Sequence, residues 1–189
     1  MHSNPAIYKR SAVCLGEDNG PGTKRYVFLP GKGGGFPHTT GLALEKIRVI
    51  LADDHPFLRT GLRKILDKTP DIVVVGEAGD GAQALNLVES LTPDVLVLDV
   101  EMPQLNGIQV ARELNSRDLN VRILVLSAHD DRAHILGMLD AGVAGYLTKD
   151  EASEVLVKAV RGVIEGKDGW LSQRVANKLG PSSGQTQRP

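Results

Sequence analysis

The stretch VLVLD at residues 95–99 holds four consecutive aliphatic residues and ends in Asp99. An aliphatic run without polar alternation is typical of a strand that is covered on both faces. Such strands occur in parallel sheets that carry helices on both sides. The stretch therefore predicts an α/β fold and places the Asp99 carboxylate at the end of a buried strand.

Four similar aliphatic runs accompany this one, and a segment with helical spacing follows each. The expected strands are residues 47–52, 71–75, 94–98, 121–126 and 143–147. The expected helices start at Pro56, after a cap at Asp80, near Ile108, after a cap at Asp130 and after a cap at Asp150. Five strand–helix units predict a flavodoxin-like (βα)5 doubly wound parallel sheet with strand order 2-1-3-4-5 and right-handed crossovers.

The two flanks of this region differ from it in composition. Residues 16–41 contain eight glycines and three prolines without sustained periodicity, so we expect residues 1–46 to form a flexible leader. The domain itself is expected to span residues 47–166. Residues 167–189 are expected to form a short helix, capped by Ser172, and a linker or tail.

Composition and charge exclude several classes of protein. No stretch approaches the roughly 18 apolar residues that a membrane helix needs. The lone Cys14 cannot form an intrachain disulfide, which suits a reducing compartment. We therefore expect a cytoplasmic protein. The net charge is −1 overall and −7 over residues 47–166. Nothing is basic enough to predict a nucleic-acid surface, whereas an acidic domain suits a divalent-cation site.

Polar residues follow four of the expected strands. They are Asp53 and Asp54, Asp99, Ser127 and Lys149. In an open α/β sheet, ligands bind outside the carboxyl ends of the strands, at the point where the strand order reverses. An aspartate at a strand end is more often a turn residue than a ligand. The coincidence of all these positions on one edge favours a common site.

The residue types in this predicted site indicate phosphoryl chemistry. Clustered carboxylates need a cation, and oxygen ligands suit Mg²⁺. Asp99 can then act as a nucleophile, as carboxylates do in aspartyl-phosphate enzymes. Lys149 and Ser127 would offer a charge and a hydrogen bond to phosphoryl oxygens.

Four motifs at the strand ends also resemble those of a known family. They are LADDH at residues 51–55, LDVEMP at 98–103 with Asn106-Gly107, LSA at 126–128, and GVAGYLTK at 142–149. Taken together, and at this spacing, they are similar to the motifs of the receiver domain of two-component response regulators. The phrase AGYLTKD at 144–150 and WLS at 170–172 are closest to the NarL/FixJ class.

The resemblance implies a role for each site residue. Asp99 would be the phosphoacceptor, with Ser127 and Lys149 on the phosphoryl oxygens. The Mg²⁺ ligands would be Asp53 through water, Asp54, Asp99 and the main-chain carbonyl of Glu101. Ser127 and Tyr146 would form the conformational switch, and Glu101 and His129 would occupy positions that tune dephosphorylation.

One position departs from the family pattern, and we expect no output domain in this chain. Asp150 follows Lys149 where many receivers have a cis proline, which leaves the geometry of that bond open. Proteins of the NarL/FixJ class bind DNA through a C-terminal helix-turn-helix. We expect none in this chain, so DNA would be reached only through an output domain absent from it.

The resemblance implies a phosphorylation switch rather than an enzyme. A sensor histidine kinase would phosphorylate Asp99, and a partner, a homodimer or a transcriptional output would respond. One alternative is a stand-alone or degenerate receiver that acts through protein contacts. A remote alternative is a Mg²⁺-dependent aspartyl phosphatase, although Glu101 stands where haloacid-dehalogenase-type sites have an acid/base aspartate.

Overall fold

The structure is a computed structural model that describes residues 12–14, 26–28, 46–117, 119–166 and 169–180. The chain divides into two units, residues 1–43 and 44–189. In the first unit, β1 (Ala12–Cys14) pairs antiparallel with β2 (Tyr26–Phe28). Most of the expected flexible leader, and residues 181–189 of the expected tail, lie outside the described residues. Those two expectations therefore stay predictions.

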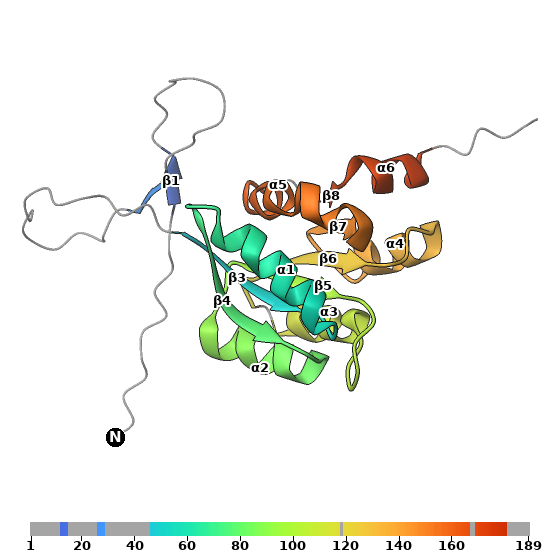
Figure 1. Cartoon of the computed structure of the whole chain (residues 1–189), viewed down its shortest axis with the longest axis horizontal. Coiled ribbons are helices and arrows are strands. Elements are labelled where there is room, and N and C mark those ends of the chain that lie inside the picture. Colours follow the sequence, from blue (N-terminus) through green and yellow to red (C-terminus); the bar gives the residue numbers. More distant parts are fainter. Residues whose placement is uncertain (1–11, 15–25, 29–45, 118, 167–168, 181–189) are drawn as a thin grey trace, which may run out of the picture. The chain divides into compact units, whose positions relative to one another are not determined.

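The second unit is built on a parallel sheet (Figure 1). Its strands are β3 (Ile47–Ala52), β4 (Ile72–Ala78), β5 (Val95–Asp99), β6 (Arg122–Ser127), β7 (Gly145–Thr148) and β8 (Trp170–Leu171). They lie in the order β4-β3-β5-β6-β7-β8. The expected α/β fold and the order 2-1-3-4-5 are confirmed. The short sixth strand, beyond residue 166, was not predicted.

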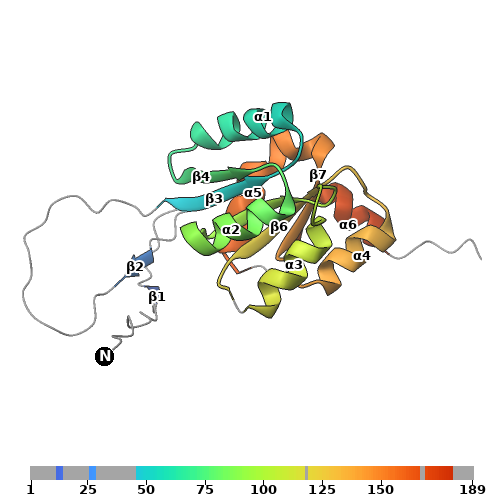
Figure 2. The same cartoon turned by 90° about the horizontal axis from the view of Figure 1, so that it is seen from below.

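Helices cover both faces of this sheet. They are α1 (Pro56–Asp67), α2 (Gly81–Leu91), α3 (Gly107–Ser116), α4 (Arg132–Asp140), the 3-10 helix η1 (Lys149–Glu151), α5 (Ala152–Ile164) and α6 (Gln173–Leu179). Helices α1 and α5 pack on one face, and α2, α3, α4 and α6 pack on the other (Figure 2).

Successive residues of the central strands serve two separate cores. In β3, Val49 and Leu51 pack toward α1 and α5, while Ile50 packs with residues of α2, α3 and α4. All five residues of β5 are buried. Double-sided burial explains why these strands are uninterrupted aliphatic runs, since each face of the sheet removes apolar surface from water.

The helix starts show where local sequence signals succeed. Asp80 caps α2 as expected, because its side chain accepts a hydrogen bond from the Gln83 N–H. At α3, Asn106 and Gln109 form a reciprocal capping box. Both caps satisfy backbone donors that a helix N-terminus leaves free.

Two other expected caps were wrong. The α4 cap is Asp131, which accepts from the His134 N–H, whereas Asp130 pairs with Arg174 and Lys178 of α6. Asp150 does not cap the helix after β7 either. A 3-10 turn intervenes there, and Thr148 and Glu151 form its capping box instead. In each case a residue close by in the sequence caps the helix instead.

The segment after α5 belongs structurally to the sheet. The Trp170 N–H donates to the Ala144 carbonyl at 3.0 Å, and β8 runs parallel to β7. Ser172 caps α6 by accepting from the Val175 N–H, and Val175 is fully buried. This helix therefore contributes to the core beside α4.

Two further findings concern the whole described part. Among these residues no peptide bond is cis, so the Lys149–Asp150 bond is trans. None of the described helices is long and apolar enough to cross a membrane.

Candidate functional site

Parallel pairing brings the polar strand ends to one edge of the sheet. Leu98 of β5 pairs with Ala52 of β3, so Asp99 and Asp53 lie one position further on neighbouring strands. Asp99 in turn pairs with Leu126 of β6, which precedes Ser127. The next pair along the sheet is Ser127 with Thr148 of β7, which precedes Lys149.

These strand-end side chains form a largely buried crevice. Asp53, Asp99 and Ser127 are each 2% exposed or less, and the Lys149 side chain is 15% exposed. Asp54 differs, because its side chain is 35% exposed. The sequence signal placed all five residues at the right edge, but it did not separate the buried Asp53 from the more open Asp54.

Lys149 bridges the two buried carboxylates. Its Nζ donates a hydrogen bond to Asp99 Oδ2 at 2.6 Å and lies 3.0 Å from Asp53 Oδ2. The other oxygen of Asp99, Oδ1, accepts from the Glu101 N–H at 3.2 Å. One ammonium thus offsets the repulsion between carboxylates that neighbouring strands force together.

This arrangement shifts two pKa values in the crevice. Burial raises the pKa of the Asp99 carboxyl above its ordinary value, although Lys149 acts in the opposite direction. Burial alone lowers the pKa of the Lys149 ammonium. Its hydrogen bond to Asp99 and its ion pair with Asp53 outweigh that effect and hold its pKa above the ordinary value. Lys149 therefore stays charged at neutral pH.

Two residues that the sequence analysis did not assign hold Asp53 in place. The His55 N–H donates to Asp53 Oδ1 at 2.7 Å, and Arg59 donates to the main-chain carbonyl of Asp53. The imidazole Nδ1 of His55 also lies 2.6 Å from Asp54 Oδ1. The position of His55 within the LADDH motif was a sequence signal for its role. Arg59 lies one helical turn further along the chain, and no motif pointed to it.

The carboxylates fit a bound divalent cation. Donor atoms from Asp53, Asp54, His55 and Asp99 all lie within 4.8 Å of one another. Asp53 Oδ2 is buried and, within the described part of the chain, forms no hydrogen bond, although Lys149 lies nearby. This oxygen is ion-paired with Lys149 but not hydrogen-bonded, and a cation would complete its interactions. Oxygen donors of this kind suit a hard ion.

The loop behind Asp99 approaches its backbone closely. A Cβ built on Gly107 would lie 2.5 Å from the Asp99 carbonyl oxygen and 2.8 Å from Val100 Cα. The Gly107 N–H donates to the Val100 carbonyl at 2.9 Å. Glycine at the start of α3 therefore lets the chain fold tightly against the end of β5.

Ser127 and Tyr146 both bind the main chain of His129. Ser127 Oγ accepts from the His129 N–H at 3.0 Å, and the Tyr146 hydroxyl donates to the His129 carbonyl at 2.8 Å. Tyr146 is fully buried, and burial raises the pKa of its hydroxyl. One peptide segment thus connects the two residues that the resemblance assigns to a switch.

Glu101 and His129 meet at the rim of the crevice. His129 Nε2 lies 3.0 Å from Glu101 Oε1. The contact lowers the pKa of the Glu101 carboxyl and raises the pKa of the His129 imidazole. The two positions expected to tune dephosphorylation therefore form one ion pair when the imidazole is protonated.

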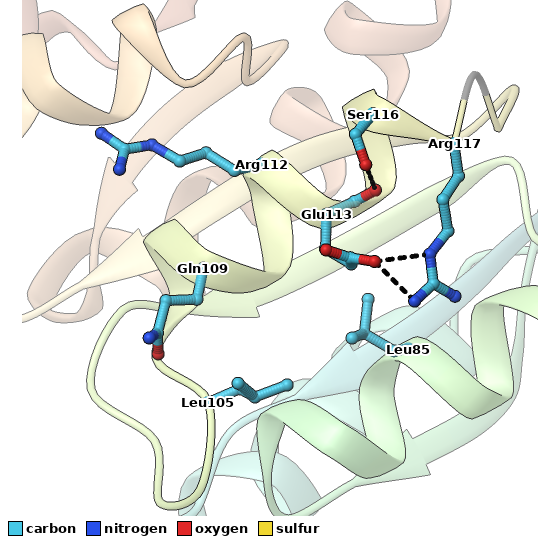
Figure 3. Close-up of a pocket in the computed structure, with 7 residues that line it drawn as sticks. All are labelled: Leu85, Leu105, Gln109, Arg112, Glu113, Ser116 and Arg117. Atoms are coloured by element: carbon cyan, nitrogen blue, oxygen red, sulfur yellow. Dashed lines mark hydrogen bonds and ion pairs between the residues drawn. The ribbon is translucent and has the colours of Figure 1, made fainter.

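A separate surface hollow of about 580 Å³ lies between α2 and α3 (Figure 3). Leu85 and Leu105 line it together with an ion pair in which Arg117 and Glu113 are 2.7 Å apart. Glu113 and Arg117 already pair with each other, and Arg112 extends away from them (Figure 3). The crevice at the strand ends remains the candidate site.

Comparison with known proteins places this architecture in a family. The model of the response regulator receiver domain family matches residues 49–161. The chain belongs to the response regulator receiver family. The strand-end crevice described above is the candidate site of this receiver unit, and the resemblance that the four motifs carry is confirmed at the family level.

The relatives of this receiver include transcriptional regulators. It is 44% identical over 144 residues to the probable transcriptional regulatory protein NarL of Mycobacterium tuberculosis, covering 72% of this chain and 67% of NarL. It is 40% identical over 135 residues to the transcriptional regulatory protein DegU of Brevibacillus brevis, covering 71% of this chain. Only 57% of DegU is covered, so the chain spans less than two thirds of that relative.

Solved structures agree with the receiver fold. The signal receiver domain of NarL from Mycobacterium tuberculosis superposes with a TM-score of 0.63 at 44% identity, over 65% of this chain and 98% of that chain. The isolated receiver domain of RcsB from Salmonella enterica serovar Typhimurium, solved in the presence of the phosphomimetic BeF3⁻, gives a TM-score of 0.66 at 29% identity. That match covers 71% of this chain and 99% of the RcsB domain.

Proposed function

We propose that this receiver is switched by transfer of a phosphoryl group to Asp99. The observation that carries the proposal is the pairing of Asp99 with Lys149 at 2.6 Å inside a crevice that also gathers Asp53 and Ser127. The donor would be the phosphohistidine of a sensor histidine kinase. This assignment names Asp99, which ends strand β5 and accepts hydrogen bonds from the Glu101 N–H on Oδ1 and from Lys149 on Oδ2.

The residues of the crevice suit each part of the transfer. A carboxylate oxygen of Asp99 forms the new bond to phosphorus while the bond from phosphorus to the donor's histidine nitrogen breaks. Lys149 and Ser127 then bind phosphoryl oxygens and compensate their charge. Lys149 must leave Asp99 Oδ2 free to react, and Asp53 gives its ammonium a second anchor 3.0 Å away.

The proposed cofactor is Mg²⁺. Asp53, Asp54, Asp99 and the main-chain carbonyl of Glu101 would hold it, as the acidic cluster and the unbonded Asp53 Oδ2 support. When bound, the ion supplies positive charge that offsets the carboxylates and the phosphoryl oxygens. The Asp54 side chain is open enough to turn from His55 toward such an ion.

Phosphorylation would be read out through the His129 peptide. A Ser127 hydroxyl that moves to a phosphoryl oxygen releases the His129 N–H, while Tyr146 still holds the carbonyl of the same residue. The β6–α4 segment would then shift and change the surface formed by α4. We propose that this surface controls a homodimer or an output domain.

The proposed setting is cytoplasmic transcription control. The names of NarL and DegU describe transcriptional regulatory proteins, and this chain aligns with part of each. By that likeness, DNA would be contacted by an output domain rather than by the receiver. Glu101 argues against the phosphatase alternative, because its carboxylate is exposed and directed to His129.

Intact-mass measurement after incubation with acetyl phosphate and Mg²⁺ tests the proposal. The unaltered protein should gain the mass of one phosphoryl group, and Asp99→Asn should gain none. Asp140→Asn, an exposed position in α4, is the matched control and should gain the group normally. Absence of labelling on the unaltered protein, or its persistence on Asp99→Asn, would refute the proposal. Repeated turnover of a phosphate ester would favour the phosphatase instead.

A further inference from the structure

A second group of metal-binding side chains lies outside the acidic crevice, where α4 begins. His129, Asp131 and His134 offer donor atoms that all lie within 4.8 Å of one another. His129 is partly exposed and the other two are exposed. Their side chains are therefore accessible to an ion from solution.

The two imidazoles are already aligned with each other. The rings of His129 and His134 stack with centroids 4.6 Å apart and planes 11° from parallel. The side chain of Asp131 caps α4 through Oδ1, and its Oδ2 lies 2.6 Å from His134 Nδ1. One short segment of chain thus fixes all three groups on one side of the loop.

Glu101 adds a contact that is typical of histidine ligands. Its carboxylate lies 3.0 Å from His129 Nε2, which leaves Nδ1 of that ring as the candidate donor. Metal-bound imidazoles usually direct their other ring nitrogen at a carboxylate or carbonyl, which fixes the tautomer and the ring orientation. Without a metal, the same side chains form two hydrogen-bonded histidine–carboxylate pairs with stacked rings, and the titration below distinguishes the two explanations.

We propose that His129, Asp131 and His134 bind one divalent transition-metal ion of the zinc type, separately from the Mg²⁺ site. Imidazole donors suit Zn²⁺, Cu²⁺ and Ni²⁺, whereas Mg²⁺ prefers oxygen donors. With bonds of about 2.0–2.1 Å, tetrahedral ligands lie about 3.3 Å apart. Asp131 and His134, which are 2.6 Å apart, must therefore exchange their hydrogen bond for bonds to the ion, and His129 must approach them by a small rotation, which the exposure of these side chains permits.

The position of this site gives it a structural consequence. The main chain of His129 binds both Ser127 and Tyr146. An ion that joins His129 to His134 would tie that peptide to the first turn of α4. The binding itself does not depend on phosphorylation, so it can be tested on the unphosphorylated protein.

Calorimetric titration with ZnCl2 in the presence of excess Mg²⁺ tests the site on the full chain. One Zn²⁺ per chain should bind with a dissociation constant in the micromolar range or below. His129→Ala and His134→Ala should each weaken binding at least about tenfold, since loss of even an indirect metal contact costs 10–100-fold. Asp131→Ser removes a ligand but retains a helix-capping side chain, and should weaken binding similarly.

Two control variants separate this site from the acidic crevice. His55→Ala removes an imidazole beside Asp53 and Asp54, and Asp99→Asn removes a carboxylate of the crevice. Both should retain tight Zn²⁺ binding. Equal affinity in His134→Ala and the unaltered chain, or loss of binding in Asp99→Asn, would overturn the proposal.

A second measurement covers variants that fail to fold. In the unaltered protein, Zn²⁺ added over Mg²⁺ should shift the ring NMR resonances of His129 and His134 and leave those of His55 in place. Shifts confined to His55, or none at all, would count against the site as firmly as the titration.

Discussion

The ammonium group of Lys149 lies 2.6 Å from Asp99 Oδ2, although the two residues are 50 positions apart in the chain. Asp99 ends the central strand β5, and Lys149 follows β7, which is two strands away in the sheet. The lysine side chain spans that separation and reaches Asp53 as well. The crevice therefore depends on one cation to keep two carboxylates together before any metal binds.

Replacement of this cation should destabilise the metal-free protein. Lys149→Ala leaves Asp53 and Asp99 buried without a counter-charge, and we expect a loss of about 3 kcal/mol in the free energy of unfolding. Urea denaturation in EDTA measures it, and excess Mg²⁺ should recover part of the loss. Lys158→Ala, an exposed position on α5, is the control and should change stability by less than about 0.5 kcal/mol. Equal losses in both variants would show that Lys149 has no such role.

The raised pKa of Asp99 predicts a pH-dependent stability difference. Because folding favours the protonated carboxyl, the ionised form destabilises the native state at neutral pH. Asp99→Asn should therefore be more stable than the unaltered protein at pH 7 without metal. The difference should shrink as the pH falls through the raised pKa and vanish below the ordinary value of about 3.9, where the carboxyl is protonated in both states.

Thermal unfolding over this pH range, with and without Mg²⁺, measures the Asp99 effect. Mg²⁺ should stabilise the unaltered protein more than Asp99→Asn. Asp140→Asn serves as the matched control and should not reproduce the pH-dependent gain. A gain for Asp99→Asn that grew toward low pH would contradict the sign of the pKa shift.

The Tyr146 hydroxyl should contribute measurably to stability. Tyr146→Phe leaves the ring in the core but removes the donor to the His129 carbonyl, with an expected cost of about 1 kcal/mol. Urea denaturation measures this cost, and NMR should show shifts at the Asp130 amide. Ser90→Ala removes an exposed hydroxyl that donates to the Asn86 carbonyl, and should be nearly neutral. If the two substitutions had the same effect, the buried hydrogen bond would be of no special importance.

Two glycine substitutions should act in opposite directions. Gly107→Ala forces a Cβ against the backbone of Asp99 and Val100, so we expect destabilisation by about 1–3 kcal/mol and slower phosphorylation. Gly61→Ala lies in α1 with nothing within 4 Å of the added carbon, and should stabilise by about 0.5–1 kcal/mol. Denaturation midpoints compare the pair, and a stabilising Gly107→Ala would refute the close approach.

The sequence predicted the sheet and the site edge because both depend on strong, repeated signals. Five aliphatic runs alternate with helical patterns, and polar residues follow the runs at equivalent positions. The pairing of Asp99 with Leu126 and of Ser127 with Thr148 converts those equivalent positions into neighbours. Strand order then follows from general rules for parallel sheets.

Features that depend on distant contacts escaped prediction. Strand β8 has two partly buried residues, too few for a periodic pattern, and it is fixed by pairing with β7 and by packing of Trp170 on Gly162. Asp130 and Asp131 are equally good caps locally. The choice between them follows from the backbone and from Arg174, 44 residues away in sequence from Asp130.

At residue 129, the main-chain hydrogen bonds and the side-chain contact have separate roles. Ser127 accepts a hydrogen bond from its main-chain N–H, and Tyr146 donates one to its main-chain carbonyl. Every amino acid except proline offers both of these groups. Its side chain is directed to Glu101 at the rim and takes no part in these two hydrogen bonds. Evolution can therefore exchange the imidazole for another side chain, and so gain or lose a ligand or a rate-setting group there, while the transmission through the backbone stays intact.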